Sequence, residues 1–176
     1  VTAQESAASV ELATRTYSGA AGLEAFLRSA GVPLDAFGHG RAKRVVDLYN
    51  EIAAGTSRLE WQEDQLVRVT RSCIVTLLRD GAALVETCQR LATGHVRDRN
   101  NLLATGMRGG ETVPEAVRRV LANEWGILED VVEVLHTSVS EEFESTPSYP
   151  GLQTLYHRHR VWAELPSGCV VGGARV

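Results

Sequence analysis

Residues 110–127 have the sequence GETVPEAVRRVLANEWGI, and this stretch decides the fold that the rest of the chain is expected to adopt. Thr112 and Glu115 form a capping box, in which each side chain accepts a hydrogen bond from the other residue's backbone N–H at a helix start. Pro114 fits the first turn, where its missing N–H costs nothing, and Gly126 is typical of a helix end. The stretch therefore predicts one helix that begins after Thr112 and ends before Gly126.

The predicted helix has one apolar face. Its apolar residues recur at helical spacing and are expected to face a hydrophobic core; they are Val113, Val117, Val120, Leu121 and Trp125. The opposite side carries Glu115, Arg118, Arg119 and Asn123. This polar side is net positive because it holds two arginines and one carboxylate. A capped amphipathic helix is also an ordinary structural element in most proteins, and that interpretation stays open.

The same stretch resembles the Nudix box, the motif of a superfamily of hydrolases that act on nucleoside diphosphate derivatives. The motif consists of Gly, five residues, Glu, seven residues and then Arg-Glu-aliphatic-any-Glu-Glu-any-Gly-aliphatic. The positions in register are Glu111, Arg119, Leu121, Glu124, Gly126 and Ile127. The positions that depart from the motif are Thr105, Val120 and Asn123. The resemblance extends over about residues 66–165, and the box is its specific part.

In the family, the glutamates of the Arg-Glu-aliphatic-any-Glu-Glu core hold Mg²⁺ against a diphosphate or activate water. Val120 and Asn123 stand at two of these positions, so the resemblance leaves the role to Glu124 alone. Losing a metal ligand and a water-activating acid commonly costs orders of magnitude in rate. We therefore expect a non-catalytic Nudix-like protein that acts as a structural or accessory subunit of a larger protein complex, with no catalytic residue, metal ion or cofactor.

The alternative is a Mg²⁺-dependent Nudix hydrolase of a nucleoside diphosphate derivative. The resemblance would then assign the catalytic roles to Glu111, Arg119 and Glu124. It would place Mg²⁺ on Glu124 together with a glutamate beyond the box, such as Glu141 in the acidic run 141–144. A solvated loop is the competing interpretation of that run.

The sequence around the box predicts an α/β fold. Residues 66–78 are a long β-rich run, Asp80-Gly81 is a type I′ hairpin signal, and residues 82–91 are expected to return as a second strand. Residues 101–110 resemble the glycine-rich approach to the box in Nudix domains. The resemblance implies a Nudix-like mixed β-sheet sandwiched by helices over residues 58–176. Residues 1–57 are expected to form an N-terminal tail and a helical extension.

The N-terminal extension is expected to contain two helices. Residues 21–29 are helical in pattern and are stopped by Gly31 and Pro33. A second helix has one apolar face and ends near Gly55; the face consists of Val45, Leu48, Tyr49 and Ile52. Residues 1–17 and 170–176 lack apolar periodicity, so we expect them to lie against neighbouring subunits. Docking of a tail on the edge of this chain's own sheet is the alternative.

Downstream of the box, residues 128–138 predict a strand, and residues 155–165 alternate between two sides as a second strand does. His157 and His159 fall on the same side of that second strand, which is the spacing that two metal ligands need. The sequence assigns no third ligand, and polar lining of the sheet is the alternative interpretation.

The cysteines allow two interpretations. Extending the hairpin register outward from Asp80-Gly81 aligns Cys73 with Cys88, close enough for a disulfide in an oxidising compartment. The chain holds three cysteines, and an odd count favours buried free thiols in a reducing environment.

The composition limits the remaining classes of function. A chain of 176 residues with 44% hydrophobic content can bury a sizeable core, and a formal charge of −4 gives no reason to expect a nucleic acid partner. No apolar run approaches the roughly 18 residues that span a bilayer, so we expect no membrane span. The first residue is Val rather than Met. Removal of a targeting peptide and a trimmed terminus are both compatible with this start. We expect an intracellular protein and, with a targeting peptide removed, the interior of an organelle, a mitochondrion rather than a plastid.

Overall fold

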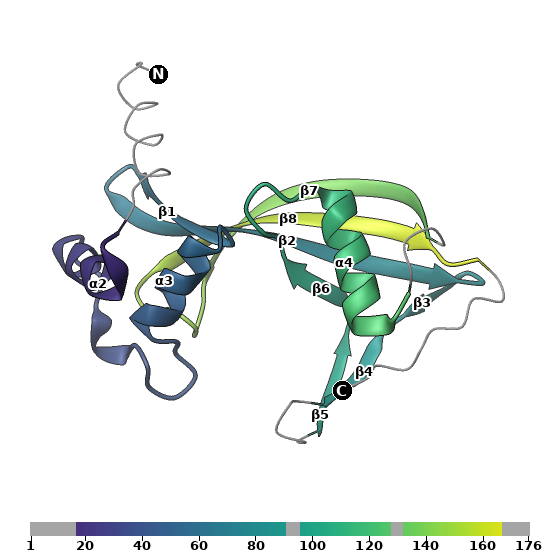
Figure 1. Ribbon diagram of the computed structural model, residues 1–176, viewed down its shortest axis with the longest axis horizontal. Coiled ribbons are helices and arrows are strands. Elements are labelled where there is room, and N and C mark those ends of the chain that lie inside the picture. The colour runs from purple at the N-terminus through teal and green to yellow at the C-terminus, as the bar shows by residue number, and fades with distance from the viewer. Residues whose placement is uncertain (1–16, 91–95, 128–131, 167–176) are drawn as a thin grey trace, which may run out of the picture. The chain divides into compact units, whose positions relative to one another are not determined.

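The computed structural model describes residues 17–90, 96–127 and 132–166, and within them the chain is mixed α/β (Figure 1). The helices are α2 (Gly19–Ser29), α3 (Val45–Ala53) and α4 (Val113–Trp125), with a short 3₁₀ helix, η1 (Leu34–Ala36). The strands are β1 (Ser57–Gln62), β2 (Gln65–Arg79), β3 (Ala82–Leu84), β4 (Glu86–Arg90), β5 (Val96–Asn101), β6 (Leu103–Gly106), β7 (Glu133–Ser145) and β8 (Gln153–Glu164). The expected α/β class is confirmed. None of the described helices combines the length and the apolar character needed to cross a membrane.

The chain divides into two compact units. The first unit consists of residues 1–71 and 141–157, and the second of residues 72–140 and 158–176. Strands β2, β7 and β8 each contribute residues to both units. The expected domain boundary after residue 57 stays a prediction, as does the docking of residues 1–17 and 170–176, most of which lie outside the described residues.

The larger sheet has the strand order β1-β2-β8-β7, and β3 and β6 also pair with β2. Strands β2 and β8 both run from the first unit into the second, whereas β7 runs the other way, so the sheet is mixed. The expected hairpin after β2 is confirmed, because Arg79 pairs with Ala82 across Asp80 and Gly81. Both turn residues have positive φ, 50° for Asp80 and 77° for Gly81, as a type I′ turn requires.

The strand expected over residues 82–91 is interrupted. Strand β3 ends at Leu84, which pairs with Leu77, and the chain then enters a separate two-stranded sheet of β4 and β5. The proposed alignment of Cys73 with Cys88 is therefore wrong, because the hairpin ends before its register reaches them. Cys73 instead pairs with Thr105 of β6. Both cysteines are free thiols, and the expectation of burial holds for Cys73 but not for the exposed Cys88.

The acidic run 141–144 belongs to strand β7 and not to a solvated loop. Strand β7 stands at the end of the strand order, where carboxylates are tolerated because side chains at a sheet edge reach water. The strand expected over residues 128–138 is confirmed from Glu133 onward, and residues 128–131 lie outside the described residues. The two N-terminal helices and the strand over residues 155–165 are also confirmed, as α2, α3 and β8.

The core of the second unit forms where α4 covers strands of the sheet (Figure 1). Strand β2 contributes Cys73, Val75 and Leu77 to this core. Strand β8 contributes Val161 and Ala163, and β6 contributes Leu103. Helix α4 contributes Ala116, Val117, Val120, Leu121 and Trp125. The predicted apolar face of this helix is therefore confirmed, with Val113 partly buried at its start.

The first unit depends on one carboxylate, Glu51 of α3. Its Oε1 accepts hydrogen bonds from Lys43 Nζ at 2.7 Å and from Tyr149 Oη at 2.8 Å. Its Oε2 accepts from Arg68 Nη2 at 2.8 Å and from Ser57 Oγ at 2.9 Å. These donors come from four separate stretches of the chain. One carboxylate thus ties α3 to β1, to β2 and to the loop before β8.

The pKa of the Glu51 carboxyl reflects these contacts. Burial raises it, but the hydrogen bond from Lys43 and the charge of Arg68 bring it down. With the hydrogen bonds of Tyr149 and Ser57, the net result is a pKa of about 2, against an ordinary value of 4.5. A carboxyl whose pKa is lower in the folded chain stabilises the fold above its ordinary pKa and loses that contribution as the pH falls toward the folded value.

We predict that Glu51→Gln lowers the free energy of unfolding by about 2–3 kcal/mol at pH 7, since the variant leaves Arg68 without its carboxylate partner. The difference between wild type and variant should be fully present above pH 4.5 and shrink as the pH falls toward 2. Urea unfolding at a series of pH values measures it. Asp64→Asn, in an exposed turn, is the control and should leave stability nearly unchanged. A difference that does not vary with pH would contradict the assignment.

Candidate functional site

Helix α4, which carries the box residues, has the predicted ends. Thr112 precedes its first turn, and the Glu115 carboxylate accepts hydrogen bonds of 2.7 Å from the Thr112 backbone N–H and from the Thr112 hydroxyl. The helix closes at Gly126, which has a φ of 66° in the left-handed region. The N–H groups of Gly126 and Ile127 donate to the carbonyls of Ala122 and Leu121. These caps fix both ends of the helix.

Arg119 joins α4 to the segment that precedes it. Its guanidinium donates two hydrogen bonds to Glu111, from Nε at 2.6 Å and from Nη2 at 2.9 Å. It also donates to Thr105 Oγ1 at 3.1 Å and to the Gly106 carbonyl at 2.9 Å. The Arg108 backbone N–H donates to the same Glu111 carboxylate at 2.8 Å. We call Arg119, Glu111, Thr105 and Gly106 the arginine clamp.

The arginine clamp determines the chemistry open to Glu111. The hydrogen bond from Arg119 is the largest influence on the pKa of this carboxyl, which it lowers against the opposing effect of burial to about 2. A general base works best when its pKa lies near the operating pH. Glu111 instead stays ionised and bound to Arg119, so its geometry suits a structural ion pair.

The three helix positions that hold glutamates in the motif differ in exposure. Val120 is only 2% exposed and lies in the core of the second unit, whereas Asn123 and Glu124 are exposed on the same helix. The prediction that Val120 extends the core face is confirmed. A carboxylate at this position would be buried among apolar side chains, where an unpaired charge is very costly.

The remaining predicted ligands are dispersed. Glu141 belongs to the first unit and its side chain is 66% exposed, with Oε1 at 3.2 Å from His157 Nδ1. Glu124 belongs to the second unit. Within the described ranges, no three side chains of His, Cys, Asp or Glu are grouped as a metal ion would need. The catalytic roles of Glu111, Arg119 and Glu124, and a metal shared by Glu124 and Glu141, stay predictions.

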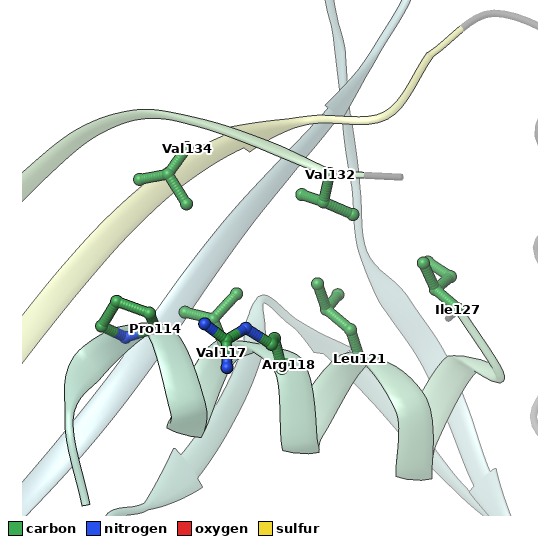
Figure 2. A pocket seen from close by; sticks show the side chains of 7 residues that line it. All are labelled: Pro114, Val117, Arg118, Leu121, Ile127, Val132 and Val134. Atoms are coloured by element: carbon green, nitrogen blue, oxygen red, sulfur yellow. The ribbon is translucent and has the colours of Figure 1, made fainter. Parts of the chain in front are cut away.

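Sequence reasoning missed a pocket between α4 and the start of β7. Figure 2 shows Val132 and Val134 pointing toward the helix across this space. The pocket has a volume of about 200 Å³ and is lined by Pro114, Val117, Arg118, Leu121, Ile127, Val132 and Val134. The alternation of Val132 and Val134 was the available signal, but only the fold shows that these side chains leave room beside the helix. Thr105 departs from the motif in sequence, and the structure gives it a role that the motif does not indicate, because its hydroxyl accepts a hydrogen bond in the arginine clamp.

Comparison with known proteins yields no protein-family model and no curated protein that matches this chain. The resemblance to the Nudix box therefore rests on the box residues and their spacing. The function has to be argued from the geometry around α4.

We predict that Glu111→Gln lowers the free energy of unfolding by about 1–3 kcal/mol, because it removes the charged partner of a largely buried arginine. Glu124→Gln makes the same change on α4 and is the matched control, and its effect should stay within about 0.5 kcal/mol because Glu124 is exposed. Denaturant unfolding at neutral pH measures both. Equal losses in the two variants would show that the arginine clamp does not stabilise the second unit.

Proposed function

We propose that this chain is a non-catalytic Nudix-like protein that acts as a structural or accessory subunit of a larger protein complex. The observation that carries the proposal is the burial of Val120. In the motif that the chain resembles, this position holds a glutamate, but here it packs among apolar residues of α4, β2 and β8. The position that would carry a catalytic glutamate on α4 is therefore part of the hydrophobic core.

The acids that remain support the same proposal. Mg²⁺ binds several oxygen ligands, and a site that cleaves a diphosphate must gather them on one face. Glu111 has both carboxylate oxygens committed to Arg119. Glu124 is exposed. The residue before it, where the motif also has a glutamate, is Asn123. Of the three glutamates that the motif has on this helix, the chain therefore keeps Glu124, which has no hydrogen bond or ion pair to the residues that the structure describes.

Exposed apolar side chains support a role in protein association. In the described part of the chain, four of the six exposed large apolar side chains belong to strand β7. They are Val134, Leu135, Val139 and Phe143, which are between 45% and 62% exposed. Single exposed apolar residues are common, but their concentration on one strand at the end of the sheet is typical of a surface that another protein covers.

The alternative function is a Mg²⁺-dependent hydrolase of a nucleoside diphosphate derivative. The exposure of Glu124, in register with the motif, is the observation that favours it. In that case Glu124 would be the essential ligand, with Glu141 as a second one. Arg119 and Glu111 would hold the loop before the helix.

We predict that the purified protein does not hydrolyse a panel of nucleoside diphosphate-linked substrates with Mg²⁺ or Mn²⁺, because two acids of the motif are absent. Release of phosphate or nucleotide, followed by chromatography, measures this. Glu124→Gln is the control for contaminating enzymes. Turnover that disappears in this variant would replace the proposal by the hydrolase.

We also predict that the protein migrates as part of an assembly in extracts of its source. The expected contact area is above about 1,000 Å², the size that a stable protein interface needs. Native mass measurement at natural abundance tests this. A monomer would refute the subunit role whatever the outcome of the hydrolase assay.

A further inference from the structure

The pocket beside α4 has the size of a side chain and not of a nucleotide. Its volume is about 200 Å³. Pockets that enclose small-molecule ligands usually measure about 300–1,000 Å³. An apolar cavity of about 150 Å³ is enough to hold a benzene ring. One aromatic or branched aliphatic side chain therefore fits this space.

The lining of the pocket combines an apolar floor with one cation. Pro114, Val117 and Leu121 present apolar side chains from α4, and Val132 and Val134 face them from the other side (Figure 2). Arg118 is the charged residue of the lining.

Arg118 is available to a partner. It is exposed, and among the residues that the structure describes it has no ion pair or hydrogen bond. Its neighbour Arg119 is fully used by the arginine clamp. The nearest carboxylate on its own helix, Glu115, is already held by two hydrogen bonds from Thr112. The mouth of the pocket thus carries a positive charge that suits a carboxylate.

Strand β7 forms one wall of the pocket and has an open edge. Over the described ranges, β7 neighbours β8 alone in the sheet. A segment added to the other edge would lie roughly 4.8 Å away, and the residue opposite Val134 would point to the same face, toward α4. Such strand addition is a common way for a folded protein to bind an extended peptide.

We propose that the pocket anchors an extended segment of a partner protein, which pairs with the edge of β7 and inserts one apolar side chain between Val134 and α4. A carboxylate one or two residues from that side chain binds Arg118. The inference rests on the proposed role as an accessory subunit and specifies which surface the partner uses and what chemistry the partner carries.

The test begins with the full chain carrying p-benzoylphenylalanine in place of Leu135, a residue of β7 that is 48% exposed and does not line the pocket, so the probe leaves the pocket open. Irradiation in an extract of the source cells, followed by mass spectrometry, identifies the cross-linked segment. The same photoreactive residue in place of Ala83, exposed on β3, is the control. The expected product is a segment of another protein in which an apolar residue lies within two positions of Asp or Glu.

A synthetic peptide of the identified segment then tests the role of Arg118 by fluorescence polarisation. Arg118→Glu should weaken its binding roughly tenfold or more, because it replaces a charge-assisted contact by repulsion. Arg41→Glu makes the same change of charge at an exposed position of the first unit and should leave binding unchanged. Replacing the peptide's acidic residue by Lys should restore binding to the Arg118→Glu variant.

Several outcomes would overturn the inference. They are a cross-linked segment without a nearby carboxylate, a cross-link to a second copy or to residues 167–176 of the same chain, and binding that ignores Arg118→Glu. If the chain migrates in an assembly but the photoreactive residue at Leu135 forms no cross-link, the edge of β7 is not the docking site and the subunit role stands. If the chain migrates as a monomer, the proposed function fails first and the inference fails with it.

Discussion

The burial of one face of α4 is the constraint on which the second unit depends. The apolar residues of this helix recur at helical spacing, so they can leave water only together, against the strands that the helix covers. Once that face is buried, the orientation of the helix about its own axis is fixed. Val120 must point into the core, and Arg118, Arg119, Asn123 and Glu124 must lie outside its centre. Both the burial of Val120 and the placement of the arginines follow from the same orientation.

Two carboxylates organise the polar parts of the two units in the same manner. Glu51 in the first unit accepts hydrogen bonds from groups as distant in sequence as Tyr149, whereas Glu111 in the second accepts them from Arg108 and Arg119. Each carboxyl has a pKa of about 2. A partly buried carboxylate is stable only when donors bind its oxygens, so each of these sites holds together the segments that supply the donors. In Glu111 this requirement conflicts with catalysis, because a carboxylate bound on both oxygens by an arginine cannot readily accept a proton. The arginine clamp is therefore better suited to hold the loop before α4 than to activate water.

Local signals predicted much of the fold. The capping box, Pro114 and Gly126 placed α4 to the residue, and Asp80-Gly81 placed the turn after β2, because these features depend on a few neighbouring residues. The register beyond that turn was predicted wrongly. Whether a second strand continues along β2 depends on which other strand competes for its edge, and β6 occupies that edge opposite Cys73. The acidic run in β7 was predicted as a loop for a related reason, since carboxylates fit a strand wherever their side chains reach water, and only the position of β7 at the end of the sheet shows that they do.

The sequence alone determined the extent of α4, its apolar face and the absence of two acids from its motif, because helix ends and amphipathic periodicity are properties of contiguous residues. It also determined that Glu111 and Arg119 would be in register with that motif. Only the tertiary structure decided that these two residues bind each other together with Thr105 and Gly106. It also decided that Val132 and Val134 face α4 across an open pocket with Arg118 at its side. Such contacts join segments that are separated in sequence, and their geometry is set by how the strands and the helix pack.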